Sequence, residues 1–318
     1  MIIVDNFDIS PRPVGRTAIT VSRLGFGAAP IGGLYTPVAE AQALETMRYA
    51  LAHGITFFDT APAYGGTLSE TRVGAALSAF PRTTFTLATK AGVNRSEMDE
   101  SSFDFSTDGI LRSVEASLKR LRVDQIDIVH LHDPDQHFRA ALDTAYPALH
   151  RLREQGVIGA IGAGMNQWEM LHAFTDHADF DCFLLAGRYT LLEQDALPLL
   201  ETCQRRGIGL FLGGIYNGGI LATGAVPGAK HNYRDAPPDI MARVRQIEQV
   251  CQRHQIPLRA AALHFAAAHP AVTAVIVGLR SMGEVDDAIA ALHTTVPPDF
   301  WRALQAEALL SGDLSFLF

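Results

Sequence analysis

The amino-acid sequence predicts an α/β fold, a (β/α)8 TIM barrel with a short N-terminal hairpin as a cap. Short runs of β-branched and aromatic residues alternate with longer segments of helical periodicity, and eight such units can be counted. This alternation implies parallel strands joined by right-handed crossovers. Eight units favour a closed barrel over an open doubly wound sheet, which remains the structural alternative.

Eight strands are predicted from their β-branched and aromatic content: Leu24–Phe26, Thr56–Asp59, Phe85–Lys90, Ile126–His132, Ile158–Gly162, Cys182–Ala186, Gly209–Leu212 and Val272–Val277. Helices are predicted between and after them: Ala39–Ala52, a helix from about Glu70, Gly109–Leu121, Arg139–Glu154, Trp168–Thr175, Leu197–Arg206, Asp239–His254, Leu258–Ala268 and Glu284–Leu292.

Local signals mark the ends of several elements. Gly54 is expected to end the first helix as a C-cap glycine, and Ser69 to cap the start of the second. Pro30 follows the first strand too closely for the glycine-rich turn and helix of an open dinucleotide-binding sheet. Residues Thr17–Val21 are expected to form the hairpin below the barrel. The glycine-rich segment Gly213–Pro238 is long enough to predict a functional loop.

Composition predicts one globular domain that spans residues 1–318. The chain is 48% hydrophobic and 19% charged, which supplies enough apolar surface for a large core. Its net charge of −8 argues against nucleic acid or an anionic membrane as a partner. The oligomeric state is left open.

The three cysteines, Cys182, Cys203 and Cys251, have neither metal-ligand spacing nor a disulfide pattern, which favours a reducing, cytoplasmic location. Residues Met1 to Arg16 lack the apolar segment of a signal peptide. No apolar run reaches membrane-spanning length.

Polar residues close three neighbouring strands of the predicted barrel. Asp59 ends the second strand, Lys90 the third and His132 the fourth, and Tyr64 follows Asp59 in the next loop. Catalytic groups of such barrels lie at the C-terminal ends of the strands. Each residue alone has an ordinary structural explanation, such as a helix cap or a buried imidazole. Four independent explanations at the same face are improbable, so these four residues are the candidate catalytic group.

A metal centre is the alternative interpretation of the same face. His130 and His132 point to one side of a strand, as the paired histidines of metal-dependent barrel hydrolases do. Further histidine or aspartate ligands are absent from the ends of strands five to eight. We therefore expect no metal, and we interpret His130 as an interior residue one layer below His132.

The segment Phe57–Glu70, with the sequence FFDTAPAYGGTLSE, resembles the signature of the aldo-keto reductase family. The resemblance extends from about Arg12 to Leu292. Further matching segments are Thr89-Lys90, Asp127–His132, Ile161-Gly162, Gly218–Leu221 and Ile276–Ser281. It implies a nicotinamide-dependent oxidoreductase on a (β/α)8 barrel.

The resemblance assigns a role to each catalytic candidate. Tyr64 is the proton donor or acceptor while hydride passes between the nicotinamide and the adjacent carbon. A phenol has a pKa of about 10, and the nearby ammonium of Lys90 is expected to lower the pKa of Tyr64. Asp59 keeps Lys90 charged and oriented, and His132 orients the substrate oxygen.

The resemblance also implies cofactor contacts, at Gly164, Asn166, Gly213, Gly214, Gly218, Gly278, Arg280 and Asp287. Three positions depart from the common family pattern. Asn166 is displaced by one residue from the usual Ser-Asn pair, Ala186 replaces a common glutamine, and Gly213 replaces a common aromatic residue.

NAD is the expected cofactor, with NADP as the alternative. The segment after the last strand carries Glu284, Asp286 and Asp287, and carboxylates bond a ribose diol but repel a 2′-phosphate. Arg280 is the nearby cation that favours NADP.

Finer motifs narrow the resemblance to one branch of the family. The versions Tyr64–Glu70, His132–Asp135 and Gly164–Trp168 resemble the branch with L-fucose, L-galactose and D-threo-aldose 1-dehydrogenases and pyridoxal 4-dehydrogenases. The expected reaction is oxidation of a cyclic hemiacetal, at C1 of an aldose, to a lactone. Pyridoxal oxidation and generic aldehyde reduction are the alternatives. A non-catalytic nicotinamide-binding regulatory subunit is the alternative from a different class.

Overall fold

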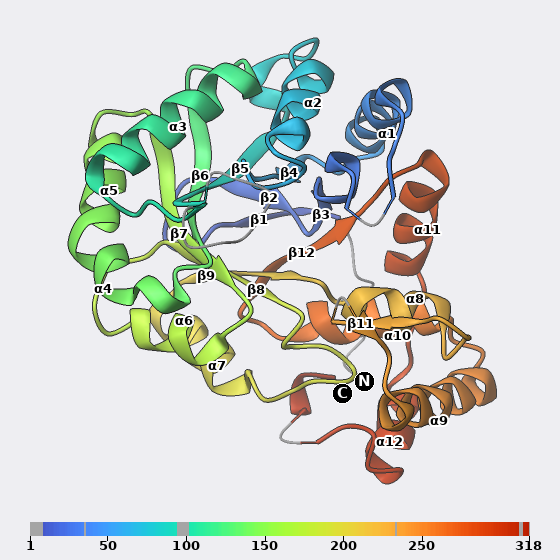
Figure 1. Ribbon diagram of the computed structural model, residues 1–318. Coiled ribbons are helices and arrows are strands. Elements are labelled where there is room, and N and C mark those ends of the chain that lie inside the picture. Colours follow the sequence, from blue (N-terminus) through green and yellow to red (C-terminus); the bar gives the residue numbers. More distant parts are fainter. Residues whose placement is uncertain (1–8, 35, 94–101, 233, 312–313, 318) are drawn as a thin grey trace.

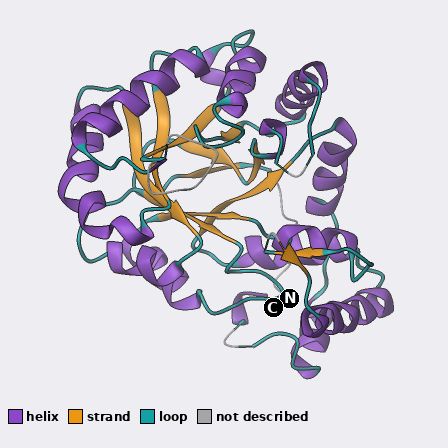
Figure 2. Ribbon diagram, in the orientation of Figure 1, coloured by secondary structure: helices purple, strands orange, loops and turns teal. Residues whose placement is uncertain are grey.

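The computed structural model contains a closed barrel of eight parallel strands, with helices around its outside (Figures 1 and 2). It describes residues 9–34, 36–93, 102–232, 234–311 and 314–317. The strands follow the chain in order around the barrel, and the last pairs with the first. They are β3 (Leu24–Gly27), β4 (Phe57–Asp59), β5 (Thr86–Ala91), β6 (Ile126–His132), β7 (Ile158–Met165), β8 (Cys182–Ala186), β9 (Gly209–Gly213) and β12 (Val272–Gly278). The predicted (β/α)8 barrel is confirmed.

Helices cover the outside of the barrel, and α12 packs beside α9 at one end (Figure 1). The α-helices are α1 (Glu40–Ala52), α2 (Leu68–Leu77), α3 (Thr107–Leu121), α4 (Phe138–Ala140), α5 (Tyr146–Glu154), α6 (Trp168–Phe174), α7 (Leu197–Arg206), α8 (Ile220–Thr223), α9 (Pro238–His254), α10 (Leu258–Ala268), α11 (Met282–Leu292) and α12 (Pro298–Ala306). Within the described residues, none of these helices is long and apolar enough to cross a membrane.

A hairpin closes the bottom of the barrel, as expected, but it extends over Pro11–Ser22 rather than Thr17–Val21. Strand β1 (Pro11–Pro13) pairs antiparallel with β2 (Thr20–Ser22). Gly15, in the turn between them, lies against the backbone at Asp181 and Gly209, where β8 and β9 begin. The hairpin therefore covers the N-terminal ends of the strands and leaves the opposite mouth open to the loops.

Of two expected helix boundaries, the one at Gly54 is confirmed and the one at Ser69 is wrong. Gly54 has a left-handed φ of 87° just after α1, as a C-cap glycine requires. Ser69 is not the N-cap of α2, because the helix begins at Leu68. The Ser69 hydroxyl instead donates to the carbonyl of Ala28 at 2.7 Å and contacts the hydroxyl of Thr60 at 2.8 Å. The serine therefore joins α2 to the loops that follow β3 and β4.

The helix expected over Arg139–Glu154 is divided by a π-helical turn at Ala141–Ala145. Within this turn, the Thr144 hydroxyl donates to the carbonyls of Phe105 and Ala140, both at 2.7 Å. The extra residue in the turn lets Thr144 reach the loop that follows β5, which simple helical periodicity does not reveal.

Side chains from alternate strand positions fill the inside of the barrel. The buried interior cluster comprises Val14, Val21, Phe57, Ala88, Ile128, Ala160, Cys182, Leu184, Phe211, Ala274 and Ile276. Asp59 and Lys90 stand two residues after members of this cluster, and His132 stands four residues after one. Because side chains on one face of a strand repeat every two residues, all three enter the same mouth of the barrel.

Glycine at position 162 is required by the packing of the interior. A Cβ atom there would overlap Nδ1 of His130 and lie 2.9 Å from the carbonyl oxygen of Cys182. His130 is fully buried, and its ring meets the ring of Phe211 edge-on at 5.9 Å between centroids. The imidazole has little freedom to move away.

We predict that Gly162→Ala lowers the free energy of unfolding by about 1–3 kcal/mol through overpacking. Gly164→Ala is the matched control on the same strand, because its Cβ would lie 3.4 Å from Cβ of Leu184, an ordinary contact. Denaturant unfolding measures both. Equal loss of stability in the two variants would contradict the proposed constraint from His130.

Candidate active site

A buried ion pair lies at the open mouth of the barrel. Nζ of Lys90 donates to both carboxylate oxygens of Asp59, at 2.9 and 2.7 Å, and to the carbonyl oxygen of Thr60 at 2.9 Å. Lys90 is 2% exposed and Asp59 is 4% exposed. Burial alone lowers the pKa of Lys90, but Asp59 and Tyr64 outweigh burial and raise it. Lys90 is therefore a fixed ammonium.

Tyr64 is placed beside this ammonium by a tight turn. Its ring centroid is 4.8 Å from Nζ of Lys90, close enough for a cation–π contact. The turn continues through Gly65, whose φ is +64° and where a Cβ atom would overlap the carbonyl of Gly32. The ring of His132 meets the Tyr64 ring edge-on, at 5.8 Å between centroids. The structure thus brings all four predicted residues together.

The phenol of Tyr64 is a weaker acid than the sequence suggests. Burial raises the pKa of Tyr64 to about 12, although the charge of Lys90 acts to lower it. The expected direction of the effect of Lys90 is correct, but the expected net shift is wrong, because desolvation of the phenolate is larger. In this state Tyr64 is a protonated group and is suited to donate.

Two histidines of β6 are held neutral. Burial is the main cause that lowers the pKa of His130, to about 3, and of His132, well below its ordinary value. Lys90 lowers both pKa values further. In the part of the chain that the structure describes, no group of three or more His, Cys, Asp or Glu side chains is arranged to hold a metal ion.

The Ser-Glu pair of the signature has a structural role behind the site. Glu70 is fully buried, and its carboxylate accepts from the Thr89 hydroxyl and from Nε of Arg120, both at 2.6 Å. Thr89 directly precedes Lys90. The buried carboxylate therefore fastens β5 to α2 and α3 next to the lysine.

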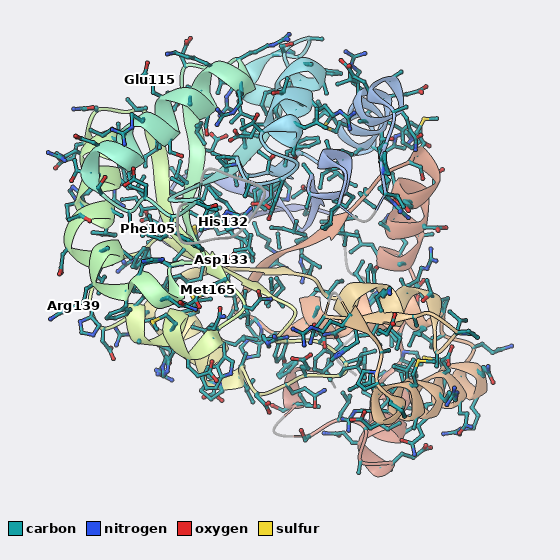
Figure 3. All side chains as sticks on the ribbon, viewed as in Figure 1. Phe105, Glu115, His132, Asp133, Arg139 and Met165 are labelled. Atoms are coloured by element: carbon teal, nitrogen blue, oxygen red, sulfur yellow. The ribbon has the colours of Figure 1, made fainter. Side chains whose placement is uncertain are left out.

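Asp133 is a site residue that the sequence analysis did not single out. It directly follows His132, and its Oδ2 lies 3.8 Å from Nε2 of the histidine. Figure 3 shows His132 and Asp133 beside each other near the centre of the ring of strands. Burial and the charge of Asp135 raise the pKa of Asp133 to about 6. An aspartate that directly follows the strand-ending histidine is the sequence signal that could have identified it.

Three of the predicted cofactor glycines lie at or near strand ends on the same mouth. Gly213 and Gly278 end β9 and β12, and Gly164 lies within β7, one residue before its end. A Cβ at Gly213 would meet only Leu184 and Ala186, at 3.6 and 3.9 Å, so the strand end is open above. Asn166 follows β7, and its amide donates to the carbonyl of Ala186 at 2.7 Å. Bare strand ends beside a fixed amide fit a flat nicotinamide ring and its carboxamide.

The carboxylate of Glu193 joins the loop after β9 to the loop after β8. Its Oε1 accepts from Asn217 at 3.1 Å, from Asn232 at 2.9 Å and contacts Nε2 of His231 at 3.2 Å. Its Oε2 accepts from Arg188 at 3.1 Å. We call these five residues the Glu193 cluster. Sequence analysis missed it because its members are distant along the chain.

The Glu193 cluster holds a short hairpin against the loop that contains two of the expected cofactor glycines. It fastens the short hairpin of β10 (Lys230–His231) and β11 (Arg234–Asp235) against the loop that contains Gly214 and Gly218. A Cβ at Gly218 would lie 3.1 Å from the carbonyl oxygen of Lys230. The long loop predicted from Gly213 is thus an ordered cover beside the mouth.

The charged residues after β12 are paired with other side chains. The guanidinium of Arg280 donates to Oε1 of Glu284 through Nε at 3.1 Å and through a terminal nitrogen at 2.7 Å. Asp287 pairs with Arg259 of α10, and Asp286 accepts from the hydroxyl of Tyr49 at 2.8 Å. Arg280 and Asp287 therefore each lie beside a protein partner of opposite charge.

Comparison with known proteins places the chain among oxidoreductases built on this barrel. Residues 23–308 match the model of the Aldo/keto reductase family. The chain therefore belongs to that family, whose members use nicotinamide cofactors, and it is an NAD(P)-dependent oxidoreductase.

Named relatives cover nearly the whole chain. It is 34% identical to pyridoxal 4-dehydrogenase of Microbacterium luteolum, over 94% of this chain and 98% of the relative. It is also 34% identical to D-threo-aldose 1-dehydrogenase of a Pseudomonas species, over 95% of this chain and 98% of the relative. The solved holo form of aldo-keto reductase AKR11C1 from Bacillus halodurans is similar, with a TM-score of 0.78 and 25% identity over 94% of this chain and 96% of that one.

We predict that acid destabilises the protein partly through its neutral histidines. Below about pH 6.5 these two histidines bind protons in the unfolded chain but stay neutral in the folded protein. The free energy of unfolding therefore falls as the pH falls. Between pH 7.5 and 5.5, His130, with its pKa of about 3, accounts for about 1.4 kcal/mol of lost stability. Denaturant unfolding at both pH values tests this, because His130→Gln should lose that share of the pH dependence. An unchanged pH dependence in the variant would show that His130 is not responsible.

Proposed function

We propose that the protein oxidises an aldose at its anomeric carbon to a lactone, with Asp59, Tyr64, Lys90 and His132 as the catalytic residues. The observation that carries the proposal is the contact of Tyr64 with a buried, ion-paired Lys90 beside His132. D-threo-aldose 1-dehydrogenase, at 34% identity over nearly the whole chain, supports the substrate class.

Each of the four side chains has a separate role in one proton transfer. A bound nicotinamide would exchange hydride with the anomeric carbon. For oxidation, the Tyr64 phenol must first release its own proton to solvent, and the resulting phenolate then accepts the proton of the anomeric hydroxyl as hydride leaves the carbon. In reduction, the neutral Tyr64 donates its proton to the carbonyl oxygen. Lys90 stabilises the phenolate that oxidation requires, and Asp59 keeps the ammonium in place. A neutral His132 donates one hydrogen bond that orients the same oxygen.

We infer a preference for NAD over NADP from the charges after β12. Arg280 already donates twice to Glu284, which reduces its availability for a 2′-phosphate. The carboxylates of Glu284 and Asp286, in α11 just after Arg280, oppose additional negative charge nearby. We propose Gly164, Asn166, Gly213, Gly214, Gly218, Gly278, Arg280 and Asp287 as the cofactor contacts.

Pyridoxal oxidation is the second candidate. Pyridoxal 4-dehydrogenase of Microbacterium luteolum is as similar to this chain as the aldose enzyme is. A cyclic hemiacetal of pyridoxal offers the same hydroxyl and hydride to the same four residues, so the catalytic proposal holds for either substrate.

We predict that Tyr64→Phe lowers the turnover number by about 10²–10⁴-fold, because the general acid–base group is lost. Binding of the nicotinamide cofactor, followed by fluorescence titration, should stay nearly unchanged, because the aromatic ring is kept. Phe103 lies outside the four-residue group, and its ring packs against Phe105 and His137. Phe103→Leu is therefore a control that should retain activity within a few-fold. Turnover by Tyr64→Phe within a few-fold of wild type would remove Tyr64 from the mechanism.

We predict that a panel of aldoses, pyridoxal and simple aldehydes identifies an aldose as the best substrate, with NAD preferred in kcat/KM. The absorbance of the reduced cofactor gives the rates in wild type and in Arg280→Ala. A wild-type preference for NADP that disappears in Arg280→Ala would identify Arg280 as a phosphate ligand and overturn the NAD proposal. Oxidation of pyridoxal alone would replace the aldose assignment, and reduction of open-chain aldehydes alone would replace both.

A further inference from the structure

Asp133 is fixed at the mouth of the barrel in an unusual backbone conformation. Its φ is 44°, in the left-handed region, and its N–H donates to the carbonyl oxygen of Gly164 at 2.9 Å. Aspartate and asparagine are the non-glycine residues that best tolerate this region, yet such conformations still cost energy and cluster at functional sites. The conformation places the carboxylate beside His132, with Oδ2 3.8 Å from Nε2.

The protein supplies little to satisfy this carboxylate. Across the described ranges, no side chain or backbone group donates a hydrogen bond to it, and its side chain keeps 30% of its surface exposed. An ionised carboxylate accepts about four hydrogen bonds. Asp135 opposes its negative charge and Lys90 favours it. The carboxylate therefore faces the site as an acceptor whose bonding capacity is unused.

We propose that Asp133 is a specificity-determining residue, which accepts a hydrogen bond from a substrate hydroxyl on the carbon next to the reacting carbon. The protein would thereby select aldoses and 2-hydroxyaldehydes over simple aldehydes. This inference rests on the proposed function of the four catalytic residues, but it does not require that the substrate be an aldose.

The geometry matches two neighbouring oxygens of one substrate. In the proposed mechanism His132 donates to the reacting oxygen through Nε2, and Oδ2 of Asp133 is 3.8 Å from that nitrogen. Each protein atom reaches an oxygen at a hydrogen-bond length of about 2.7–3.0 Å, so a vicinal pair of oxygens spans them. A substrate without the second hydroxyl would displace water from the carboxylate without replacing its hydrogen bond, which is how such sites reject an analogue.

The alternative is that Asp133 only turns the chain after β6. Asp133→Gly separates the two roles, because glycine accepts a left-handed φ at no steric cost and lacks the carboxylate. Asp133→Asn also keeps the turn and replaces the charged acceptor with a weaker neutral one. Asp135→Asn is the matched control, since it removes a nearby charge two residues further along the chain.

The experiment compares reduction of lactaldehyde, which has the 2-hydroxyl, with reduction of propanal, which lacks it. We expect wild type and Asp135→Asn to prefer lactaldehyde by about 10- to 100-fold in kcat/KM, the range of a charge-assisted hydrogen bond. Asp133→Gly should reduce this ratio to within about threefold of one, because the KM for lactaldehyde rises more than the KM for propanal. Asp133→Asn should be intermediate.

Several results would overturn the inference. A lactaldehyde-to-propanal ratio that is unchanged in Asp133→Gly would do so, as would an equal loss of activity on both aldehydes. If no aldose is oxidised while the ratio depends on Asp133, only the aldose assignment fails. If nothing is turned over, calorimetric titration of the two aldehydes gives the decision: equal binding overturns the role of Asp133, and a preference for lactaldehyde that disappears in Asp133→Gly supports it.

Discussion

The ion pair between Lys90 and Asp59 is the interaction on which the candidate site depends. The ammonium of Lys90 is only 2% exposed, and it is tolerated because a carboxylate and a backbone carbonyl accept hydrogen bonds from it at 2.7–2.9 Å. Removal of one partner of such a pair typically costs about 3–5 kcal/mol, since the other charge remains buried and unpaired. The charge of Lys90 acts on the pKa of Tyr64, His130 and His132. Burial is the larger cause at all three groups, and the charge of Lys90 adds to it at the histidines and opposes it at Tyr64.

The barrel supplies the geometry that makes this pair possible. Interior side chains repeat every second residue, so the polar groups that end β4, β5 and β6 enter one space above an apolar interior. That interior excludes water from below, which explains why desolvation dominates the pKa of Tyr64 and keeps the histidines neutral. Behind the site, Glu70 joins three elements and prevents β5 from shifting.

Sequence periodicity was sufficient to predict the eight strands and the convergence of the four catalytic candidates, because strand ends in a barrel share one face. Contacts between distant segments could not be predicted in this way. Ser69 resembled a helix cap but bonds to Ala28 instead, and Thr144 lies in a π-helical turn that periodicity conceals. The balance between burial and charge at Tyr64 depends on the depth of the mouth, which local sequence does not record.

The Glu193 cluster has a consequence for how this protein can change. Four side chains from three separate loop segments share one carboxylate, so a substitution in any one loop alters the partners of the others. Such positions are expected to show strongly non-additive effects when they are combined. A loop transplanted from a relative would therefore retain its shape only if Glu193 and its donors were transferred as a unit. The sequence of the loops beside the mouth can therefore change only if the residues of the Glu193 cluster change together.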